Sequence, residues 1–306
     1  MRFGRLTIPV PVLIAVLAMP AAADGQAVLT SRVTVVRVDA GVTHQGRPVE
    51  GLTAADFEVL DNGVSQKAWM LNAEETPLSV YLVLDTSTSV AGAKLEHLVE
   101  AATAFLDGLR DGDEAALVTF SEDLRLVKPL TTEFADVRTA LTNVVPEGAT
   151  SLIDALSAAL LLPVALERRT IAIVFSDGRD TLSWLSEEDV MELARRSEIL
   201  GYAVALHEEA NSLGRRSAFG AQSEPTNIRI LRRTAETTGG QMALAASSAQ
   251  LKGLFLQALR DIRGRYVLAY YPEGVTSDGW HHIEVRLRGK KGDVRTRPGY
   301  FASHHE

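Results

Sequence analysis

An apolar run from Leu78 to Leu84 stops abruptly at Asp85, and hydroxyl residues follow it as far as Ser89. A run that is apolar at nearly every position is typical of a strand buried on both faces, as in a parallel sheet. Such a strand delivers the residues that follow it to the carboxyl edge of the sheet, where open α/β sheets bind their ligands. The run therefore predicts a buried parallel strand that places Asp85, Ser87 and Ser89 at a binding edge.

Two other segments carry polar side chains toward the same predicted edge. A second apolar run, Ile171 to Phe175, leads into Asp177. A glycine-containing loop, Gly148 to Ser151, presents Thr150 just before a predicted helix. Because the carboxyl ends of parallel strands meet at one edge of a sheet, we expect these three distant segments to come together.

The middle of the chain alternates predicted strands and helices, which is the pattern of a doubly wound sheet with helices on both faces. We therefore expect an α/β fold with a mostly parallel sheet. The predicted strands are 78–84, 115–120, 124–128, 170–175, 202–206 and 241–244, and the predicted helices are 93–110, 134–143, 151–162, 187–200, 227–238 and 248–263.

The two ends of the chain are rich in strand signals. Residues 32–39 nearly alternate polar and β-branched side chains, and Asn62-Gly63 supplies a tight hairpin turn between 57–60 and 65–71. Near the other end, 266–271 has strand character and 283–288 alternates strictly. Because the N-terminal part is too small to bury a core alone, we predict that residues 24–76 and 265–306 form one small β-sandwich. The α/β domain, residues 77–264, is then inserted between its halves.

The three polar segments resemble the metal-ion-dependent adhesion site (MIDAS) of the von Willebrand factor A (VWFA) domain. Asp85-x-Ser87-x-Ser89, Thr150 and Asp177 match the five metal-site positions of the family, and the resemblance covers residues 77 to about 264. It departs at Thr88 and Ala149, where many members carry glycine, and this puts the detailed loop geometry in doubt. The terminal segments 51–57 and 297–301 also resemble those that flank the domain in secreted bacterial VWFA-related proteins.

The resemblance implies a bound Mg²⁺, with Mn²⁺ or Ca²⁺ as alternatives. In the family the serines ligate directly, and the threonine and aspartates ligate directly or through water. Hydroxyl and carboxylate oxygens are the ligands that such hard cations prefer. An open metal position would be filled by an exposed carboxylate of a protein or cell-surface ligand, which makes the expected function divalent-cation-dependent binding or adhesion.

Each residue of this set also has an ordinary structural role. Asp85 alone is suited to cap a helix, Ser87 and Ser89 to satisfy turn amides, and Thr150 to cap the helix that follows it. Asp177-Gly178 is also a common turn. Caps and turns, however, require no agreement among three distant segments, and the joint pattern favours a metal site.

The composition excludes several other functions. The 31 Lys and Arg against 39 Asp and Glu give a formal net charge of -8, so nothing favours approach to nucleic acid or to an anionic membrane. The absence of cysteine excludes disulfides, zinc-thiolate sites and thiol catalysis. Residues 1–23 combine a basic start, an apolar core and Ala21-Ala22-Ala23, as in an export signal. We expect a cleaved signal peptide, no stable membrane insertion after cleavage, and a periplasmic or extracellular location.

Two other functions stay open. One is a non-catalytic scaffold of an envelope complex, in which the metal is structural and the β-sandwich makes the contacts. The other is a metal-dependent hydrolase, because haloacid-dehalogenase-type phosphatases also begin with a strand that ends in aspartate. Those enzymes need a second aspartate where Ser87 stands here, and the chain has no P-loop and no nucleophile elbow. We therefore expect no enzymatic activity.

The remaining candidates are weaker. Asp154 and Asp180 are interpreted as solvated carboxylates near the site. The histidines at 281, 282, 304 and 305 are expected to face solvent rather than to bind zinc. The basic run at 286–291 is expected to be a solvated strand face, and 208–226 a long surface loop at the edge that carries Asp85.

Overall fold

The central sheet has six strands in the order β11–β10–β9–β6–β7–β8, and only β8 runs antiparallel to its neighbour. The computed structural model describes residues 35–72, 76–165, 167–207, 224–275 and 278–302. The sheet thus confirms the predicted α/β class with a mostly parallel sheet. Its strands are β6 (Leu78–Asp85), β7 (Glu114–Phe120), β8 (Leu124–Thr131), β9 (Arg169–Ser176), β10 (Leu200–Leu206) and β11 (Met242–Ala245).

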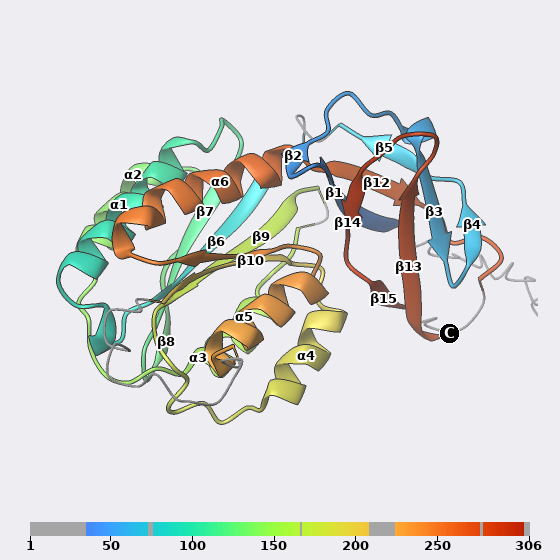
Figure 1. Ribbon diagram of the computed structural model, residues 1–306. Helices are drawn as coiled ribbons and strands as arrows, with labels where there is room; N and C mark the ends of the chain where they lie inside the picture. Colours follow the sequence, from blue (N-terminus) through green and yellow to red (C-terminus); the bar gives the residue numbers. More distant parts are fainter. Residues whose placement is uncertain (1–34, 73–75, 166, 208–223, 276–277, 303–306) are drawn as a thin grey trace, which may run out of the picture. The chain divides into compact units, whose positions relative to one another are not determined.

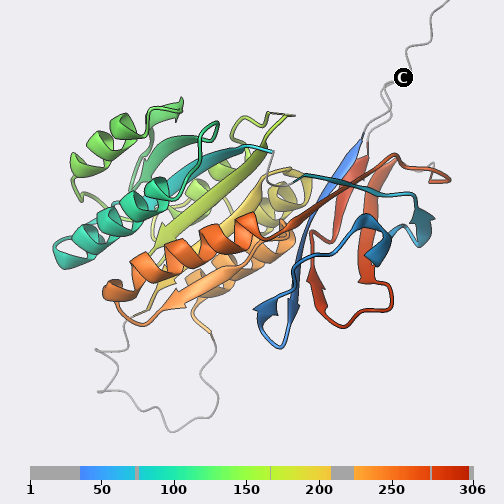
Figure 2. The same ribbon diagram turned by 90° about the horizontal axis from the view of Figure 1, so that it is seen from above.

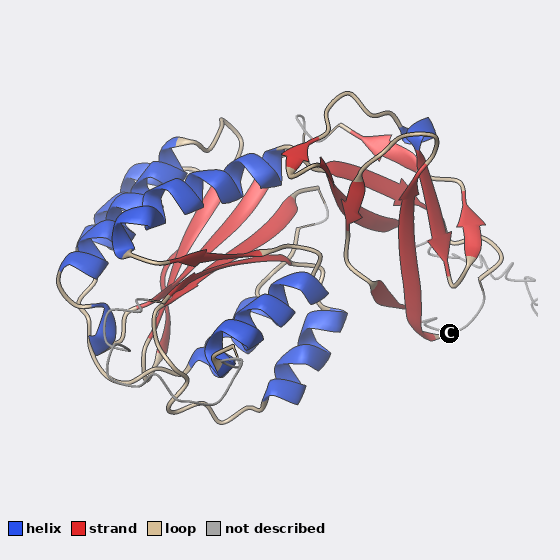
Figure 3. Cartoon of the chain, viewed as in Figure 1, coloured by secondary structure: helices blue, strands red, loops and turns tan. Residues whose placement is uncertain are grey.

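Helices cover both faces of this sheet (Figures 1 and 3). Alternate residues of β6 face the two sides, which is why the run is apolar throughout: Leu82 joins one core cluster and Val83 the other. On the first face α1 and α6 lie side by side, and Phe105 meets Phe255 edge-on at a centroid distance of 6.5 Å (Figure 2). The first face carries α1 (Ala93–Asp107), α2 (Phe134–Thr142) and α6 (Leu251–Arg263), and the second carries α3 (Leu152–Leu160), α4 (Glu187–Arg196) and α5 (Thr226–Thr237).

Two antiparallel sheets bring the ends of the described chain together. Val36 pairs with Tyr270 in one sheet, and Phe57 pairs with Leu287 in the other. Residues of both sheets share one hydrophobic cluster. The first sheet contains β14 (Asp293–Arg295), β1 (Val36–His44), β12 (Tyr266–Tyr270) and β5 (Trp69–Leu71), with β2 (Arg47–Pro48) beside β1, and the second contains β15 (Gly299–Ala302), β13 (Gly279–Leu287), β3 (Phe57–Asp61) and β4 (Val64–Gln66). The division of the chain into domains at residues 76 and 264 stays a prediction.

Several predicted elements have different bounds in the structure; the helix expected at 93–110, for example, ends at Asp107, and the strand expected to end at residue 39 continues to His44. Two further differences have a visible cause. The expected strand 65–71 is split into β4 and β5, which belong to different sheets. Gln66 ends the first piece, because its side-chain amide bonds the backbone of Glu273 in both directions. The expected helix 187–200 ends at Arg196, because the Ser197 hydroxyl bonds the Leu160 carbonyl and the Ile199 N–H and so draws the chain away. The turn at Asn62-Gly63 is confirmed, with φ of 46° and 81°.

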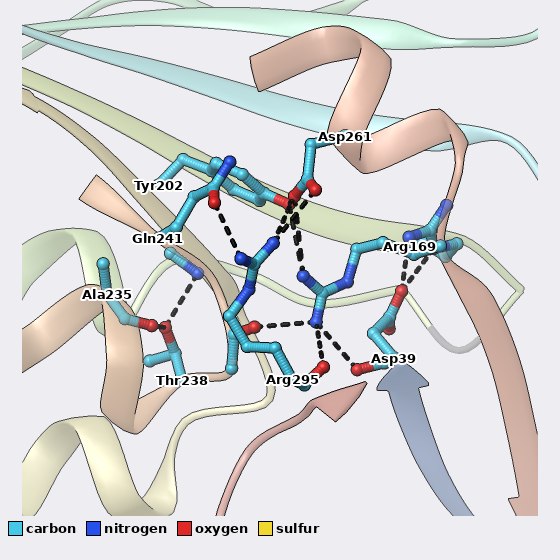
Figure 4. A network of polar contacts seen from close by, with 11 residues as sticks. Asp39, Arg169, Tyr202, Ala235, Thr238, Gln241, Asp261 and Arg295 are labelled. Atoms are coloured by element: carbon cyan, nitrogen blue, oxygen red, sulfur yellow. Dashed lines mark hydrogen bonds and ion pairs between the residues drawn. The ribbon is translucent and has the colours of Figure 1, made fainter. Parts of the chain in front are cut away.

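A buried arginine, Arg265, links the central sheet to the antiparallel strands, and its Nη1 lies 3.4 Å from the Tyr202 hydroxyl of β10. Figure 4 shows its partners Asp39, Tyr202, Asp261 and Arg295. Arg265 is 2% exposed, and its Nη2 lies 2.8 Å from the Asp39 carbonyl of β1, 2.7 Å from that of Gly239 and 3.1 Å from that of Arg295. Arg295 in turn bonds Asp261 of α6 at 2.8 Å. The charge of Arg265 is thus shared among carbonyl oxygens and the Asp261 carboxylate, which offsets the cost of burying it.

Within the described ranges, none of the helices has both the length and the apolar character that a membrane crossing requires. The predicted signal peptide, residues 1–23, and most of the predicted 208–226 loop lie outside the described residues.

Candidate metal centre

Strand register places the first and third polar segments side by side. β6 and β9 are parallel neighbours, with Leu84 opposite Phe175. Asp85 ends β6 and Ser176 ends β9, so Asp85 and Asp177 emerge at the same edge of the sheet. Thr150 comes from the loop before α3 and is 5% exposed.

The side chains of the first segment form a connected set with Asp177. Asp85 is fully buried, and its Oδ1 accepts from the Ser87 N–H at 2.9 Å. Its Oδ2 accepts from the Ser176 hydroxyl at 2.7 Å. The Ser87 and Ser89 hydroxyls are 3.0 Å apart, and the Ser89 hydroxyl donates to Asp177 Oδ1 at 2.6 Å. Four of the five predicted ligands, Asp85, Ser87, Ser89 and Asp177, are therefore linked by direct contacts.

The fifth predicted ligand, Thr150, meets this set beside Gly178. A Cβ atom placed on Gly178 would lie 3.1 Å from Thr150 Oγ1, 3.6 Å from Asp85 Oδ2 and 3.6 Å from Ser89 Oγ. Three oxygens from the first segment and from the threonine loop thus surround one point beside Gly178, which belongs to the third segment. The missing side chain of Gly178 leaves that point open.

Backbone contacts hold the threonine loop against the first segment. Thr88 donates both its N–H, at 3.0 Å, and its hydroxyl, at 2.9 Å, to the Gly148 carbonyl. Gly148 has a φ of 72°, in the region that favours glycine. The hydroxyl of Thr88, where many family members have glycine, is therefore used to tie the two loops together.

Lys94 is a member of this cluster that the sequence did not indicate. Its Nζ lies 2.6 Å from Asp177 Oδ2 and 3.2 Å from the Ser89 carbonyl. The Asp177 side chain is 1% exposed, so the ion pair is largely shielded from water. The only sequence signal was a lysine in the first turn of the helix that follows Ser89.

Burial dominates the electrostatics of Asp85. Desolvation raises the pKa of this carboxyl above its usual range, and the charge of Asp177 adds to the effect. Hydrogen bonds from Ser176 and Ser87 oppose the rise without cancelling it. The buried carboxylate is therefore in a place where a nearby cation would be stabilising.

The donor set fits a hard divalent cation. It offers two carboxylates and three hydroxyls, all of them oxygen donors. Over the described ranges, no cluster of three or more His, Cys, Asp and Glu side chains is arranged to hold a metal. The candidate centre combines three hydroxyls with only two carboxylates, so it is not a cluster of that kind. It contains none of the softer imidazole or thiolate ligands.

Two carboxylates near the site are not the solvated groups that we expected. The carboxylate of Asp154 accepts the N–H groups of Trp184 and Leu185, each at 3.0 Å. Asp180 accepts the Ile153 N–H at 3.2 Å and the Ser183 hydroxyl. Both are half-buried. Asp154 of α3 binds backbone N–H groups of the loop that follows Asp177, and Asp180 in that loop binds a backbone N–H of α3.

The prediction that His281 faces solvent is wrong. It is 2% exposed, and its Nδ1 lies 2.8 Å from Oδ1 of the fully buried Asp61. Tyr270 and Tyr300 donate to the other oxygen of Asp61 at 2.9 and 2.8 Å. His282 is exposed as expected, and residues 304 and 305 lie outside the described residues.

The central sheet and its helices have the fold of a VWFA domain. Residues 80–179 match the family model of the von Willebrand factor type A domain. Among solved structures, von Willebrand factor type A from Catenulispora acidiphila superposes with a TM-score of 0.51 at 13% identity, covering 87% of this chain and 72% of that one. At this identity the likeness shows the fold alone.

Two mammalian proteins are similar to part of the chain. Inter-alpha-trypsin inhibitor heavy chain H2 of Mus musculus is 27% identical over 139 residues, which are 41% of this chain and 15% of the relative. The protein of the same name from Sus scrofa is 34% identical over 91 residues, 28% of this chain and 10% of the relative. The chain thus matches no more than 15% of the length of these two relatives.

Proposed function

We propose that this chain is a binding module that uses a divalent cation, most simply Mg²⁺, to hold a carboxylate of a protein or cell-surface ligand. The observation that carries the proposal is the convergence of the Thr150, Asp85 and Ser89 oxygens on one point beside Gly178. The family supports it, because VWFA domains typically serve as adhesion or protein-interaction modules.

The contacts of the two aspartates suggest which side chains would bind the cation directly and which through water. Both carboxylate oxygens of Asp85 already accept hydrogen bonds, and those of Asp177 face Ser89 and Lys94. The hydroxyls of Ser87, Ser89 and Thr150 would then hold the cation directly, with the aspartates acting mainly through water. A bound cation would supply an electrophilic position, because few full negative charges touch it. Its remaining shell suits an incoming carboxylate.

We propose binding rather than catalysis as the role of this site. Ser87 stands where a phosphatase of the haloacid dehalogenase type would need its second aspartate. The formal net charge of -8 is unfavourable for nucleic-acid partners. Residues 1–23 support export to the periplasm or beyond the cell.

Metal binding is tested with the purified chain by calorimetric titration of MgCl₂ and MnCl₂. Thr150→Val removes one hydroxyl at nearly constant volume and should lower the affinity by about tenfold or more. Thr150→Ser keeps the hydroxyl and should bind nearly as the wild type does. Thr142→Ala, at the end of α2, is the control for loss of a hydroxyl elsewhere. Circular dichroism should show the same fold in all four chains.

Carboxylate capture is tested with a fluorescein-labelled peptide that contains one Asp, and with the same peptide carrying Asn. Fluorescence anisotropy should show binding of the Asp peptide in Mn²⁺ and its loss in EDTA. The Asn peptide should not bind in either buffer. Binding that survives EDTA undiminished would rule out the metal-bridged mechanism.

A further inference from the structure

The loop that leaves the candidate metal centre displays large apolar side chains to solvent. We call residues 178–185 the Trp184 loop. Trp184 is 95% exposed, and Leu182 and Leu185 are 46% and 41% exposed. An indole this exposed contributes almost nothing to the free energy of folding, because that contribution depends on burial. A cluster of such side chains on one short loop marks an interaction surface.

The backbone of the Trp184 loop is fixed from within the domain. Asp154 of α3 accepts the N–H groups of Trp184 and Leu185, each at 3.0 Å. Asp180 accepts the Ile153 N–H at 3.2 Å and the Ser183 hydroxyl. These contacts fix the backbone position of Trp184, although its indole remains exposed to solvent. A partner that covers it would thus not have to order the loop first, and that lowers the entropic cost of binding.

The Trp184 loop lies next to a predicted metal ligand. The Thr181 N–H donates to the Thr150 carbonyl at 2.9 Å, and the Thr150 N–H donates to the Thr181 hydroxyl at 3.1 Å. Trp184 is the third residue after Thr181, so their Cα atoms are at most about 11 Å apart. Two or three residues of an extended peptide span a comparable distance, about 7–11 Å. Trp184 is therefore within reach of the side chains next to a carboxylate that binds at the metal.

The charges beside the loop favour a protein partner over a lipid surface. The first turn of α4, directly after the loop, carries Glu187, Glu188 and Asp189. Glu187 is paired with Arg229 and Arg233, so the repulsion of anionic phospholipid headgroups would come from Glu188 and Asp189 and from the formal net charge of -8. Tryptophan is also among the residues that contribute most to protein interfaces.

We propose that the Trp184 loop is the second contact of the ligand that binds at the metal. The ligand is a protein segment with one acidic residue, whose carboxylate completes the metal shell, and a large apolar residue two or three positions away, which packs on Trp184. This inference rests on the proposed function of the metal centre and adds the sequence that the site selects.

The test compares two fluorescein-labelled peptides that are rich in Gly and Ser and contain one Asp. One peptide also carries Leu and Phe at the second and third positions after the Asp. In Mn²⁺ the wild-type chain should bind the apolar peptide about tenfold more tightly, a typical value for one aromatic contact in an interface. Trp184→Ala should reduce this preference to about twofold or less, since the contact is lost. Its affinity for Mn²⁺, measured by calorimetry, should not change.

Leu161→Ala is the matched control. Leu161 is 68% exposed and follows α3, whose other end carries Thr150, so the variant removes an exposed apolar group far from the site. It should keep the full preference for the apolar peptide. Thermal melting should give the same midpoint for wild type, Trp184→Ala and Leu161→Ala, because neither side chain is buried.

The outcomes separate the two proposals. If the wild-type chain binds Mn²⁺ but shows no preference, or if Trp184→Ala keeps the preference, the role of the loop is refuted and the metal site stands. If the wild-type chain does not bind Mn²⁺, both proposals are refuted. A blue shift of tryptophan emission with phosphatidylcholine vesicles, absent in Trp184→Phe, would replace the protein partner by a lipid surface and refute the proposed ligand.

Discussion

Lys94 Nζ lies 2.6 Å from Asp177 Oδ2, so a fixed positive charge stands at the edge of the oxygen cluster. The Lys94 side chain is 29% exposed, whereas the Asp177 side chain that it faces is 1% exposed. This pair neutralises one of the two carboxylates that a divalent cation would meet. The chain therefore presents a weaker negative field at the site than its residues alone would indicate.

Lys94→Gln should strengthen metal binding. Removing the ammonium leaves the charge of Asp177 unopposed, so the affinity for Mn²⁺ should rise by about fivefold or more. Calorimetric titration at constant ionic strength measures the change. Lys252→Gln, which breaks an exposed pair with Glu100 on another helix, is the control and should leave the affinity unchanged. A weaker affinity in Lys94→Gln would mean that the lysine acts mainly by positioning Asp177.

Gly178→Ala should weaken metal binding without unfolding the chain. The added methyl would lie 3.1 Å from Thr150 Oγ1 and would occupy the open point among the oxygens. We expect the affinity for Mn²⁺ to fall by about tenfold, as hard cations tolerate little distortion of their shell. Gly253→Ala is the control, since nothing lies within 4 Å of its added Cβ. That variant should gain about 0.5–1 kcal/mol of stability, because Ala favours the interior of α6. Unchanged affinity in Gly178→Ala would argue against a metal at this point.

Arg265→Ala should be among the most destabilising single substitutions in the chain. The guanidinium is buried against three carbonyl groups and lies 3.6 Å from Asp261. Removing it leaves buried acceptors unpaired, and the free energy of unfolding should fall by about 3–5 kcal/mol. Urea denaturation followed by circular dichroism measures it. Arg138→Ala, which breaks the exposed pair with Asp107, should cost under about 1 kcal/mol. Similar losses in both variants would show that burial does not matter here.

The tyrosines around Asp61 should make the chain sensitive to alkali. Burial, with the charge of Asp61, raises the pKa of Tyr270 and Tyr300 well above the usual value. Their neutral form is thus favoured in the folded state, while unfolded tyrosines ionise near a pKa of about 10. This stabilisation is complete below about pH 10 and is lost as the pH rises further. Tyr300→Phe should show a smaller fall in melting temperature than the wild type between pH 9 and 11.5. An equal fall would remove Tyr300 from the explanation.

The sequence determined those parts of the site that depend on strand periodicity. Two apolar runs that end in Asp85 and Asp177 predict two buried parallel strands, and parallel neighbours must end at the same edge. Thr150 could be added because a glycine loop precedes its helix. His281 was also within reach of this argument: it lies two residues before Ile283 on an alternating strand and so shares its buried face.

Other parts of the site depend on contacts that no local pattern encodes. A lysine in a helical first turn does not reveal that it will reach Asp177 from there. The acidic residues Asp154 and Asp180 do not show in the sequence which backbone N–H groups they will accept. Arg265 directly follows a helix, and no local pattern indicates that it is buried. Its burial is stabilised by the carbonyl groups of Asp39 and Arg295, which come from distant strands.

The pairing of β1 with β12 and of β3 with β13 has a consequence for the order of events during synthesis. Val36 cannot pair until Tyr270 has been synthesised, and Phe57 cannot pair until Leu287 has been synthesised. All six strands of the central sheet, in contrast, lie between residues 78 and 245. As the chain emerges from its N-terminus onward, the sheet that carries the candidate metal centre can therefore assemble first. β1 and β3 are thus synthesised first but paired last. Until they pair, their unpaired backbone edges can associate with other chains.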